Sequence, residues 1–366
     1  MTARAALADR VRLALLLVRP PVLILLAMFT ATGLAQAGRT EAPYPLGRAL
    51  LAVAGFLLFS VVCNDLADEE IDRVNLPGRR PLAAGLVTRG TFTVIGLTAG
   101  AVALAASATL RWQAVAVTGA GLAVSAAYSL PPVRLAGRGA VASLILPACY
   151  VAVPYADGVL AAGPAFRPAD LFLLAGLYLG FTGRILLKDF RDVRGDALFG
   201  KRTFLVRHGR RATCLASGCC WAAGTAAVLA ATRQLTPLLA AAEAGCTLAA
   251  LWLLGALARS RSDRRDEALI AAVAIAGRGM ILLLLAHLSL VSAGWPAPGY
   301  GAVMAALCLL IAGPAASMAR NGPVSRLTVP PAGYPAGVPG DCPSPAPPGS
   351  PPGASSSGAA NSANAA

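Results

Sequence analysis

The sequence predicts an all-α protein, a bundle of nine or ten helices that cross a membrane. Its 366 residues are 57% hydrophobic and only 13% charged, and the mean hydropathy is +0.66. Soluble domains carry about a quarter charged residues. Apolar stretches of the length that a helix needs to cross a bilayer, roughly 20 residues, recur along most of the chain. These observations together indicate a membrane protein with many spans.

The predicted spans follow one another with short connections. The first apolar run is long and has no convincing cleavage site of small residues, so we interpret it as a span and not as a signal peptide. In chain order the spans cover residues 13–37, 47–63, 91–109, 113–130, 140–160, 169–187, 212–232, 235–257, 268–293 and, for the tenth, 299–318.

Basic residues are distributed unevenly between the two sets of connections. The N-terminus and every second connection hold dense groups of arginine, whereas the alternate connections hold only Arg39, Arg48, Arg111, Arg167 and Arg233. By the positive-inside rule, the first set faces the cytoplasm. We therefore expect an integral protein of the plasma membrane, in contact with lipid, whose net charge of +14 mostly reflects topology. No nucleic acid is expected as a partner, because the cations lie in separate short loops.

The chain changes character after the last span. From residue 321 it is rich in Pro, Gly, Ser and Ala. Such a segment cannot bury enough apolar surface to offset its ordering entropy. The sequence thus predicts a transmembrane domain at 1–320 and a disordered tail at 321–366.

An acidic run, "NDLADEEID", directly follows the second predicted span. Asp65, Asp68 and Asp72 are spaced i, i+3 and i+7, and Asn64 lies four residues before Asp68. On a helix these spacings place the three aspartates along one face, whereas the two glutamates point elsewhere. Because three like charges in a row repel one another, we expect cationic side chains against them.

A second run repeats this spacing after the sixth predicted span. Asp189, Asp192 and Asp196 are again i, i+3 and i+7, and by the count of spans they emerge on the same side of the membrane. Six aspartates converge there if the two helices are neighbours. For one run alone, a solvated helix end or an ion-pair network is the alternative. Two runs with the same spacing on one face favour a site.

Carboxylates from two helices suit Mg²⁺, which binds proteins through a few carboxylates together with phosphate oxygens. Basic residues interleaved with the two runs could hold the rest of a diphosphate. These are Arg79, Arg80, Lys188, Arg191, Arg194, Lys201 and Arg202. The pattern predicts a metal and diphosphate site that opens into an apolar chamber.

The two runs resemble the signatures of the UbiA superfamily of intramembrane prenyltransferases. "NDLADEEID" is similar to N-D-x-x-D-x-x-x-D, and Asp189, Asp192 and Asp196 are similar to D-x-x-D-x-x-x-D. The stretch "DRVNLPGRRPLAAG" is similar to the segment that follows the first signature. "YSLPPVRLAGRG" places Tyr128 and Arg134 where the family has a tyrosine and a basic residue. The resemblance covers about residues 13–318.

The resemblance implies nine helices around a central cavity, capped on the cytoplasmic side by the Asp-rich loops. It implies Mg²⁺-dependent ionisation of an allylic isoprenyl diphosphate and capture of the allylic cation by an acceptor. Fixed positive charge stabilises the leaving group, and the apolar bundle excludes water. The expected metal ligands are Asn64, Asp68, Asp189 and Asp192. Asp65, Asp72 and Asp196 are expected as further ligands, positioning groups or acceptor-side bases. The expected substrate-binding residues are Lys188, Arg80, Arg134, Lys201 and Tyr128.

The second run also bears on the acceptor. "KDFRDVRGDALFGKRTFLVRHGRR" is similar to the pattern of the homogentisate prenyltransferase branch, which favours an aromatic acceptor such as a phenol or quinone precursor. Prenyl transfer to a glycerol phosphate and a terpene cyclase remain open alternatives. The sequence leaves the length of the isoprenoid and the oligomeric state open.

A cation-coupled transporter is an alternative of another class. It would predict charged residues deep in the spans or broken helices in two related halves. Here the acids lie at span ends and deep ionisable residues are nearly absent, which favours the enzyme. Arg184, Arg278 and His287 lie within predicted spans, and we leave them out of the site. Candidate cavity walls, for which simple packing is the alternative, are Tyr150, Tyr155, Tyr178 and Phe181.

Overall fold

A computed structural model describes residues 13–38, 43–75, 80–163, 165–190 and 203–322. Every regular element in these ranges is helical, which confirms the predicted fold class. The described residues all belong to the first of two compact units, Met1–Leu327. The second unit, Thr328–Ala366, lies outside them, so the predicted division into a membrane domain and a disordered tail stays a prediction.

Eight stretches of helix in the described part of the chain are long and apolar enough to cross a membrane. Two further helices coincide with predicted spans: α2 is apolar but shorter, and α6 is not among the eight. The number of spans therefore stays a prediction. The elements are α2 (Pro20–Gln36), α3 (Pro43–Ala67), α4 (Glu69–Asn75), α5 (Arg89–Ala108), α6 (Trp112–Ser129), α7 (Ala140–Pro147), α8 (Val153–Ala162), α9 (Pro168–Leu186), α11 (Phe204–Ala231), α12 (Pro237–Arg259), α13 (Asp263–Ser292) and α14 (Ala297–Asn321).

Local sequence signals define several helix ends. The side chain of Thr88 accepts a hydrogen bond from the backbone N–H of Thr91 at 3.2 Å and caps α5. Thr236 caps α12 in the same way, and Pro237 follows at the first helical position. A threonine cap satisfies an N–H that has no partner within the helix, and proline loses nothing in the first turn because its missing N–H would be unpaired there.

The fifth predicted span is interrupted in its middle. A π-helical turn, Ala148–Ala152, separates α7 from α8. Pro147 and Pro154 flank this turn, and each lacks the N–H that a regular α-helix needs at that position. The turn contains Tyr150, whose ring stacks on that of Phe181 with centroids 5.7 Å apart. The span was predicted in its extent but not in this widened turn.

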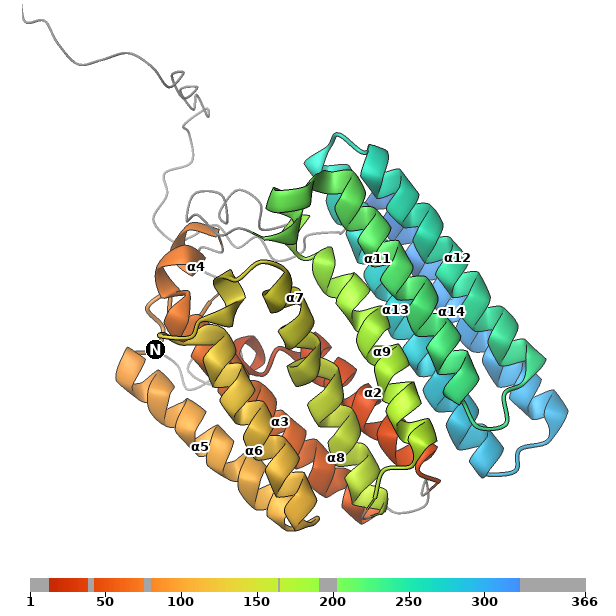
Figure 1. Cartoon of the computed structure of the whole chain (residues 1–366), viewed down its shortest axis with the longest axis horizontal. Helices are drawn as coiled ribbons and strands as arrows, with labels where there is room; N and C mark the ends of the chain where they lie inside the picture. The colour runs from red at the N-terminus through yellow and green to blue at the C-terminus, as the bar shows by residue number, and fades with distance from the viewer. Residues whose placement is uncertain (1–12, 39–42, 76–79, 164, 191–202, 323–366) are drawn as a thin grey trace, which may run out of the picture. The chain divides into compact units, whose positions relative to one another are not determined.

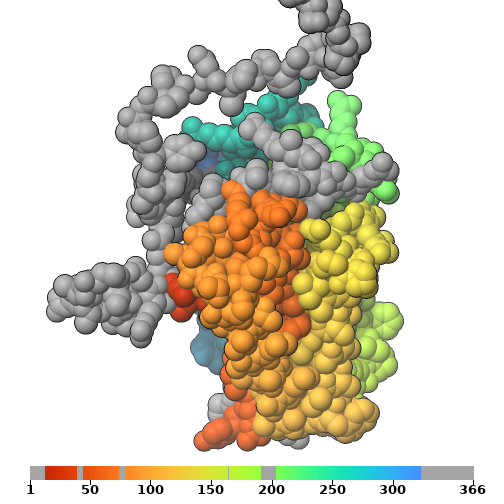
Figure 2. Space-filling model, turned by 90° about the vertical axis from the view of Figure 1, so that its left-hand side faces the viewer, coloured from red at the N-terminus to blue at the C-terminus, as the bar shows by residue number. Residues whose placement is uncertain are grey.

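Figure 1 shows two groups of neighbouring helices, one of α3, α5 and α6 and the other of α11, α12, α13 and α14. Helix α2 contacts α3 and α8 on one side and α13 on the other, and α9 packs along α11. Figure 2 shows the face formed by α5 and α6. Large apolar side chains are exposed on these helices, among them Val94, Leu97 and Trp112. Such a surface suits lipid and not water, and the protein is an integral membrane protein.

Glycines allow α9 and α11 to approach closely. A Cβ atom added at Gly176 would lie 2.7 Å from the backbone nitrogen of Val228, and one added at Gly224 would lie 2.7 Å from that of Gly180. The hydroxyl of Ser217 donates to the carbonyl of Gly183 at 2.8 Å across the same contact. Small residues that bring backbones together are typical of helix pairs in membranes.

His287 belongs to a structural network at the opposite end of the bundle from the acidic runs. Its Nδ1 lies 2.9 Å from the hydroxyl of Tyr300, and its Nε2 lies 3.2 Å from the carbonyl oxygen of Arg233. The same hydroxyl lies 2.7 Å from Oγ1 of Thr236. The imidazole thus ties α13 to α14 and to the connection between α11 and α12.

The expectation that deep ionisable residues are nearly absent is wrong for two carboxyl groups. Asp157 on α8 is fully buried and accepts a hydrogen bond from Thr118 at 3.1 Å. Thr118 lies 2.7 Å from the hydroxyl of Ser107, so a polar chain links α8, α6 and α5. Glu243 on α12 is 1% exposed. Buried polar groups usually have hydrogen-bond partners, and Asp157 conforms to this rule.

Candidate functional site

The first acidic run lies where α3 ends and α4 begins. Asp65 is in the last turn of α3, Asp68 lies at the bend between the helices, and Asp72 lies on α4. The spacing predicted one continuous helix, but the run is divided between two helices that meet at Asp68. Hydrogen bonds from the N–H of Asp68 to the carbonyl of Asn64, at 2.9 Å, and from Asp72 to Asp68, at 2.7 Å, keep helical spacing across the bend. The acids in the first turn of α4 also favour a helix start there.

Arginines lie against these carboxylates, as like-charge repulsion predicted. Nη2 of Arg19 lies 2.5 Å from Oδ1 of Asp65, and Nη1 of Arg80 lies 3.3 Å from the same oxygen. Nε of Arg80 lies 3.4 Å from Oδ2 of Asp72. The side chain of Asp65 is 1% exposed. A carboxylate buried this deeply needs such pairing, because desolvation of an isolated charge is costly.

Arg19 was not among the candidate site residues. In the sequence it is one of several cations before the first span, and its partner lies 46 residues further along the chain. Its backbone has φ 48° and ψ 65°, which lies in the left-handed region that residues other than glycine rarely adopt. Pro20 follows it and disfavours the right-handed helical conformation at this position. An arginine directly before a proline at the mouth of a span was the available signal.

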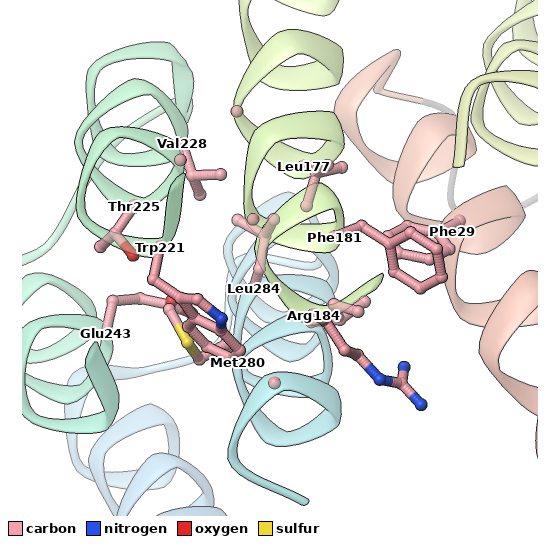
Figure 3. A pocket seen from close by; sticks show the side chains of 15 residues that line it. Phe29, Leu177, Phe181, Arg184, Trp221, Thr225, Val228, Glu243, Met280 and Leu284 are labelled. Atoms are coloured by element: carbon pink, nitrogen blue, oxygen red, sulfur yellow. The ribbon is translucent and has the colours of Figure 1, made fainter. Parts of the chain in front are cut away.

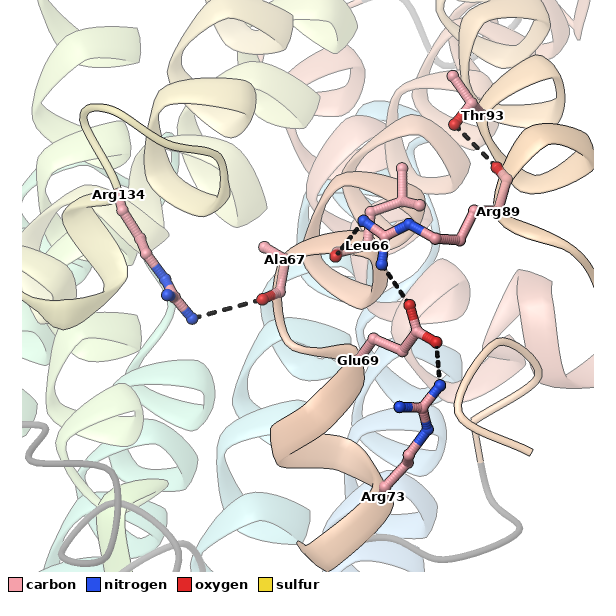
Figure 4. A network of polar contacts seen from close by, with 7 residues as sticks. All are labelled: Leu66, Ala67, Glu69, Arg73, Arg89, Thr93 and Arg134. Atoms are coloured by element: carbon pink, nitrogen blue, oxygen red, sulfur yellow. Dashed lines mark hydrogen bonds and ion pairs between the residues drawn. The ribbon is translucent and has the colours of Figure 1, made fainter. Parts of the chain in front are cut away.

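Asp68 has a different cation. Nη2 of Arg134, from the connection between α6 and α7, lies 3.0 Å from its Oδ1 and 3.4 Å from the carbonyl oxygen of Ala67. Figure 4 shows this side chain reaching across to Ala67. The side chains of Arg134 and Asp68 are 42% and 16% exposed, so this pair is open to solvent, unlike the pair of Asp65 and Arg19.

Glu69 faces away from these carboxylates. It forms ion pairs with Arg73 and Arg89, and Nη2 of Arg89 also lies 3.4 Å from the carbonyl oxygen of Leu66 (Figure 4). These contacts join α4 to the start of α5. Glu69 therefore holds α4 in place beside the aspartates.

The start of the second run approaches the first. Lys188 and Asp189 directly follow α9, whereas Asp192, Asp196 and Lys201 lie outside the described residues. Tyr128, at the end of α6, is buried and lies within electrostatic range of Lys188, Asp189 and Asp68. Residues from both runs, Asp68 from the first and Lys188 and Asp189 from the second, thus act electrostatically on one tyrosine.

A complete metal site is not assembled by the described residues. Among them, no group of three or more Asp, Glu, His or Cys side chains is arranged to hold a metal ion. The oxygen donors of Asn64, Asp68 and Asp189 nevertheless have the chemistry that Mg²⁺ prefers. Oδ2 of Asp65 is buried without a hydrogen-bond partner in the described part of the chain. The donor set therefore fits Mg²⁺ in kind.

Aromatic rings continue from Tyr128 into the bundle. Tyr128 lies within electrostatic range of Tyr150, which stacks on Phe181, and Phe181 meets Phe29 edge to face with centroids 5.9 Å apart. The guanidinium carbon of Arg184 lies 5.5 Å from the centre of the Phe181 ring. Rings in this arrangement can face a cation.

The other two candidate wall residues have packing roles in the described structure. Tyr155 is fully buried in the core that also contains Phe29 and Phe181. The hydroxyl of Tyr178 donates to the carbonyl oxygen of Leu144 and links α9 to α7. Of the four predicted wall residues, Tyr150 and Phe181 thus form the aromatic row.

A narrow pocket with a cavity volume of about 60 Å³ lies at the end of this aromatic row, between α2, α9, α11, α12 and α13. Figure 3 shows Phe29 and Phe181 beside it and Arg184 nearby on α9. Arg184 precedes Lys188 by one helical turn, so the pocket lies next to the second acidic run. Most of its lining is apolar, as expected for a chamber that houses hydrocarbon.

Comparison with known proteins agrees with this geometry. The model of the UbiA prenyltransferase family matches residues 25–276, more than half of the chain. The chain belongs to the UbiA prenyltransferase family. The match confirms the resemblance inferred from the acidic runs, and it includes both of them.

Two relatives that match this chain are named as synthases of different products. The bacteriochlorophyll synthase 34 kDa chain of Chloroflexus aurantiacus is 29% identical over 170 residues, which cover 45% of this chain and 54% of that protein. The digeranylgeranylglyceryl phosphate synthase of Methanoculleus marisnigri is 33% identical over 175 residues, covering 46% and 58%. This UbiA-family chain thus spans a little over half the length of these relatives.

Solved structures show the same fold. A structure of digeranylgeranylglyceryl phosphate synthase has a TM-score of 0.61 at 16% identity and covers 77% of this chain and 99% of that chain. A UbiA homolog from Archaeoglobus fulgidus bound to DMAPP and Mg²⁺ has a TM-score of 0.51 at 13% identity and covers 84% and 99%. At these identities the likeness shows the shared helical fold alone.

Proposed function

We propose that this protein transfers a prenyl group from an allylic isoprenyl diphosphate to an acceptor, in a reaction that requires Mg²⁺. One observation carries the proposal: Asp68 of the first run and Lys188 and Asp189 of the second all lie within electrostatic range of Tyr128, at the head of an aromatic row that leads to an apolar pocket. Membership of the UbiA prenyltransferase family supports it. The homolog bound to DMAPP and Mg²⁺ supports the substrate class and the metal.

Asn64, Asp68, Asp189 and Asp192 would hold Mg²⁺, which when bound neutralises charge on the leaving diphosphate. Asp68 presents a partly exposed carboxylate for this purpose, with Arg134 on one of its oxygens. Because the side chain of Arg134 is 42% exposed, its guanidinium has room to turn toward a phosphate when Asp68 binds the metal. A planar guanidinium can form two parallel hydrogen bonds to a phosphate.

In this proposal Asp65 and Asp72 mainly hold arginine side chains in position. Oδ1 of Asp65 is shared by Arg19 and Arg80, and Arg80 also contacts Asp72. Two carboxylates therefore restrain the guanidinium of Arg80 in one orientation. Preorganised cations stabilise developing negative charge without reorganising during the reaction. Together with Lys188, these arginines would bind the diphosphate, and Tyr128 would line its allylic end.

The remaining candidates complete the proposed site from the second run. Lys201 would bind the diphosphate, and Asp196 would serve as a ligand or positioning group. Both lie outside the described residues, so these assignments rest on their place in the acidic motif.

An aromatic ring, such as a phenol or quinone precursor, is the proposed acceptor. The sequence around the second run supports it through its similarity to the homogentisate prenyltransferase branch. A second candidate comes from the names of the relatives, a bacteriochlorophyll synthase and digeranylgeranylglyceryl phosphate synthases. These names favour a bacteriochlorophyll precursor or a glycerol phosphate as the alternative acceptor. We also propose that the acidic end of the bundle faces the cytoplasm at the plasma membrane, as the arginine distribution indicates.

Release of diphosphate from allylic diphosphates of ten to twenty carbons tests the proposal. The purified protein is incubated in lipid vesicles with Mg²⁺, or with EDTA, and with panels of phenolic and glycerol phosphate acceptors. Release should require Mg²⁺ and one class of acceptor, and Asp68→Asn should lower its rate at least about a hundredfold, the usual size of losing a major electrostatic contribution.

Glu70→Gln is the matched control, because Glu70 is an exposed acid in the same run. This variant should keep the wild-type rate. Release without any acceptor would identify a cyclase, and release unaffected by both EDTA and Asp68→Asn would contradict the proposed chemistry.

A further inference from the structure

The pocket between α9, α11, α12 and α13 contains an acid that the proposed reaction does not use. Glu243 projects from α12 into this pocket and is 1% exposed (Figure 3). Within the described residues, its Oε1 is buried and accepts no hydrogen bond. Asp157, a carboxyl buried within another span, accepts one from Thr118. Glu243 is therefore a buried acid with an unused acceptor oxygen that lines this pocket.

A second polar atom in the same pocket is also unsatisfied. Nε1 of Trp221 is buried and has no hydrogen-bond acceptor among the described residues, and Trp221 lines the pocket beside Glu243 (Figure 3). The nearby hydroxyl of Thr225 is already engaged with that of Thr247 at 2.8 Å. Leaving a buried polar group unsatisfied is costly, so two of them in one pocket indicate a ligand that supplies a partner for each.

The chemistry of the two atoms limits what can bind. The Glu243 oxygen requires a donor, the Trp221 N–H requires an acceptor, and the remaining lining consists largely of apolar side chains such as Leu177, Met280 and Leu284. A hydroxyl group is both donor and acceptor. A hydrocarbon alone satisfies neither atom, and an ether satisfies only the indole. An ionic head group beside Glu243 and Trp221 would lose its hydration, because the cationic side chain of the lining, Arg184, points away from both (Figure 3).

We propose that this pocket is a binding site for an apolar molecule that carries a hydroxyl group, which hydrogen-bonds to Glu243. An alkylphenol and an aliphatic alcohol present the same group. The proposal goes beyond prenyl transfer, because binding here needs neither Mg²⁺ nor a diphosphate.

Trp221 provides a direct readout of occupancy. The other three tryptophans, Trp112, Trp252 and Trp295, are 75%, 66% and 50% exposed. Replacing each of them by Phe leaves the fluorescence of Trp221 alone. The protein in lipid vesicles is titrated with para-dodecylphenol, with dodecanol and with the methyl ether of each compound. In each ether a methyl group replaces the hydroxyl hydrogen, so the compound keeps its acceptor oxygen but cannot donate a hydrogen bond.

At least one alcohol should change Trp221 fluorescence with about tenfold higher affinity than its ether, the size of one lost hydrogen bond to a buried charged or polar group. The alcohol with the larger ratio identifies whether a phenol or an aliphatic alcohol is preferred. In Glu243→Leu the alcohol and its ether should bind with equal affinity. Glu243→Gln should keep the preference for the alcohol, because the amide oxygen still accepts a hydrogen bond. Asp157→Asn, which alters a buried carboxyl outside the pocket, should leave the ratio unchanged.

Equal affinities for alcohol and ether, or no fluorescence response to any of the four compounds, would overturn the proposal. Thermal unfolding of each variant in the same vesicles separates a binding defect from misfolding. Failure of this test leaves Mg²⁺-dependent release of diphosphate unaffected, since that assay depends on Asp68 and not on Glu243.

Discussion

At the scale of single residues, Asp65 shows how a charge is accommodated next to lipid. Its carboxylate is 1% exposed and is shared by two arginines, one before the first span and one after α4. The side chain of Arg19 is 21% exposed, so both partners are largely removed from water. Removal of Arg19 leaves this buried carboxylate with Arg80 alone, at 3.3 Å.

Replacement of either partner should therefore destabilise the protein. Arg19→Ala should lower the free energy of unfolding by about 1–3 kcal/mol, the cost of removing one partner of a buried polar group. Unfolding in mixed detergent micelles measures the change. Arg73→Ala is the control, because it removes the exposed ion-pair partner of Glu69. The loss of such an exposed ion pair should cost about 0.5 kcal/mol. Equal effects of the two substitutions would show that the pair of Arg19 and Asp65 is not special.

At the scale of helices, contact between backbones at glycine holds α9 against α11. This contact positions the end of α9, from which Lys188 and Asp189 emerge toward Tyr128. The same pair of helices contributes one wall of the pocket, including Gly176 and Gly224. The site and the pocket thus depend on one close helix contact.

Substitutions on α9 can separate close packing from helix propensity. Gly176→Ala should destabilise the bundle by about 1–3 kcal/mol, because its Cβ would lie 2.7 Å from the backbone of Val228. Gly180→Ala is the control on the same helix, since a Cβ there meets nothing within 4 Å. It should be neutral or stabilising by up to about 1 kcal/mol, as expected from helix propensity. Thermal unfolding in detergent distinguishes the two, and equal destabilisation would contradict the close contact.

At the scale of the whole molecule, the acidic runs and the connection between α11 and α12 lie at opposite ends of the bundle. Helix α11 begins after the second run and ends before that connection, which holds a single arginine, Arg233. The arginine distribution predicts that the acidic end faces the cytoplasm.

Labelling with a membrane-impermeant thiol reagent tests this orientation. In a cysteine-free background, Glu70→Cys should react only in inside-out vesicles, and Gln234→Cys should react only in right-side-out vesicles. Both positions are exposed in the structure. The reverse pattern would place the diphosphate site on the outer side of the membrane and would refute the predicted topology.

Local signals in the sequence were sufficient for the helices and for the kind of site. Composition, apolar stretches and capping residues act within windows of about 20 residues, so they predicted the fold class and where most helices lie. The spacing of the two acidic runs predicted carboxylates with cations against them, and the arginines on Asp65, Asp68 and Asp72 agree with it.

Only the tertiary structure decided which groups meet. Arg19 and Arg134 pair with aspartates 46 and 66 residues away. No local pattern in the sequence indicates which arginine pairs with which aspartate over such a separation. The π-helical turn that directs Tyr150 toward Phe181, and the unsatisfied oxygen of Glu243, likewise result from how helices pack. Residue type and spacing are properties of the chain itself. The partner of a side chain depends on the relative position of helices, which is set by contacts such as those at Gly176 and Gly224.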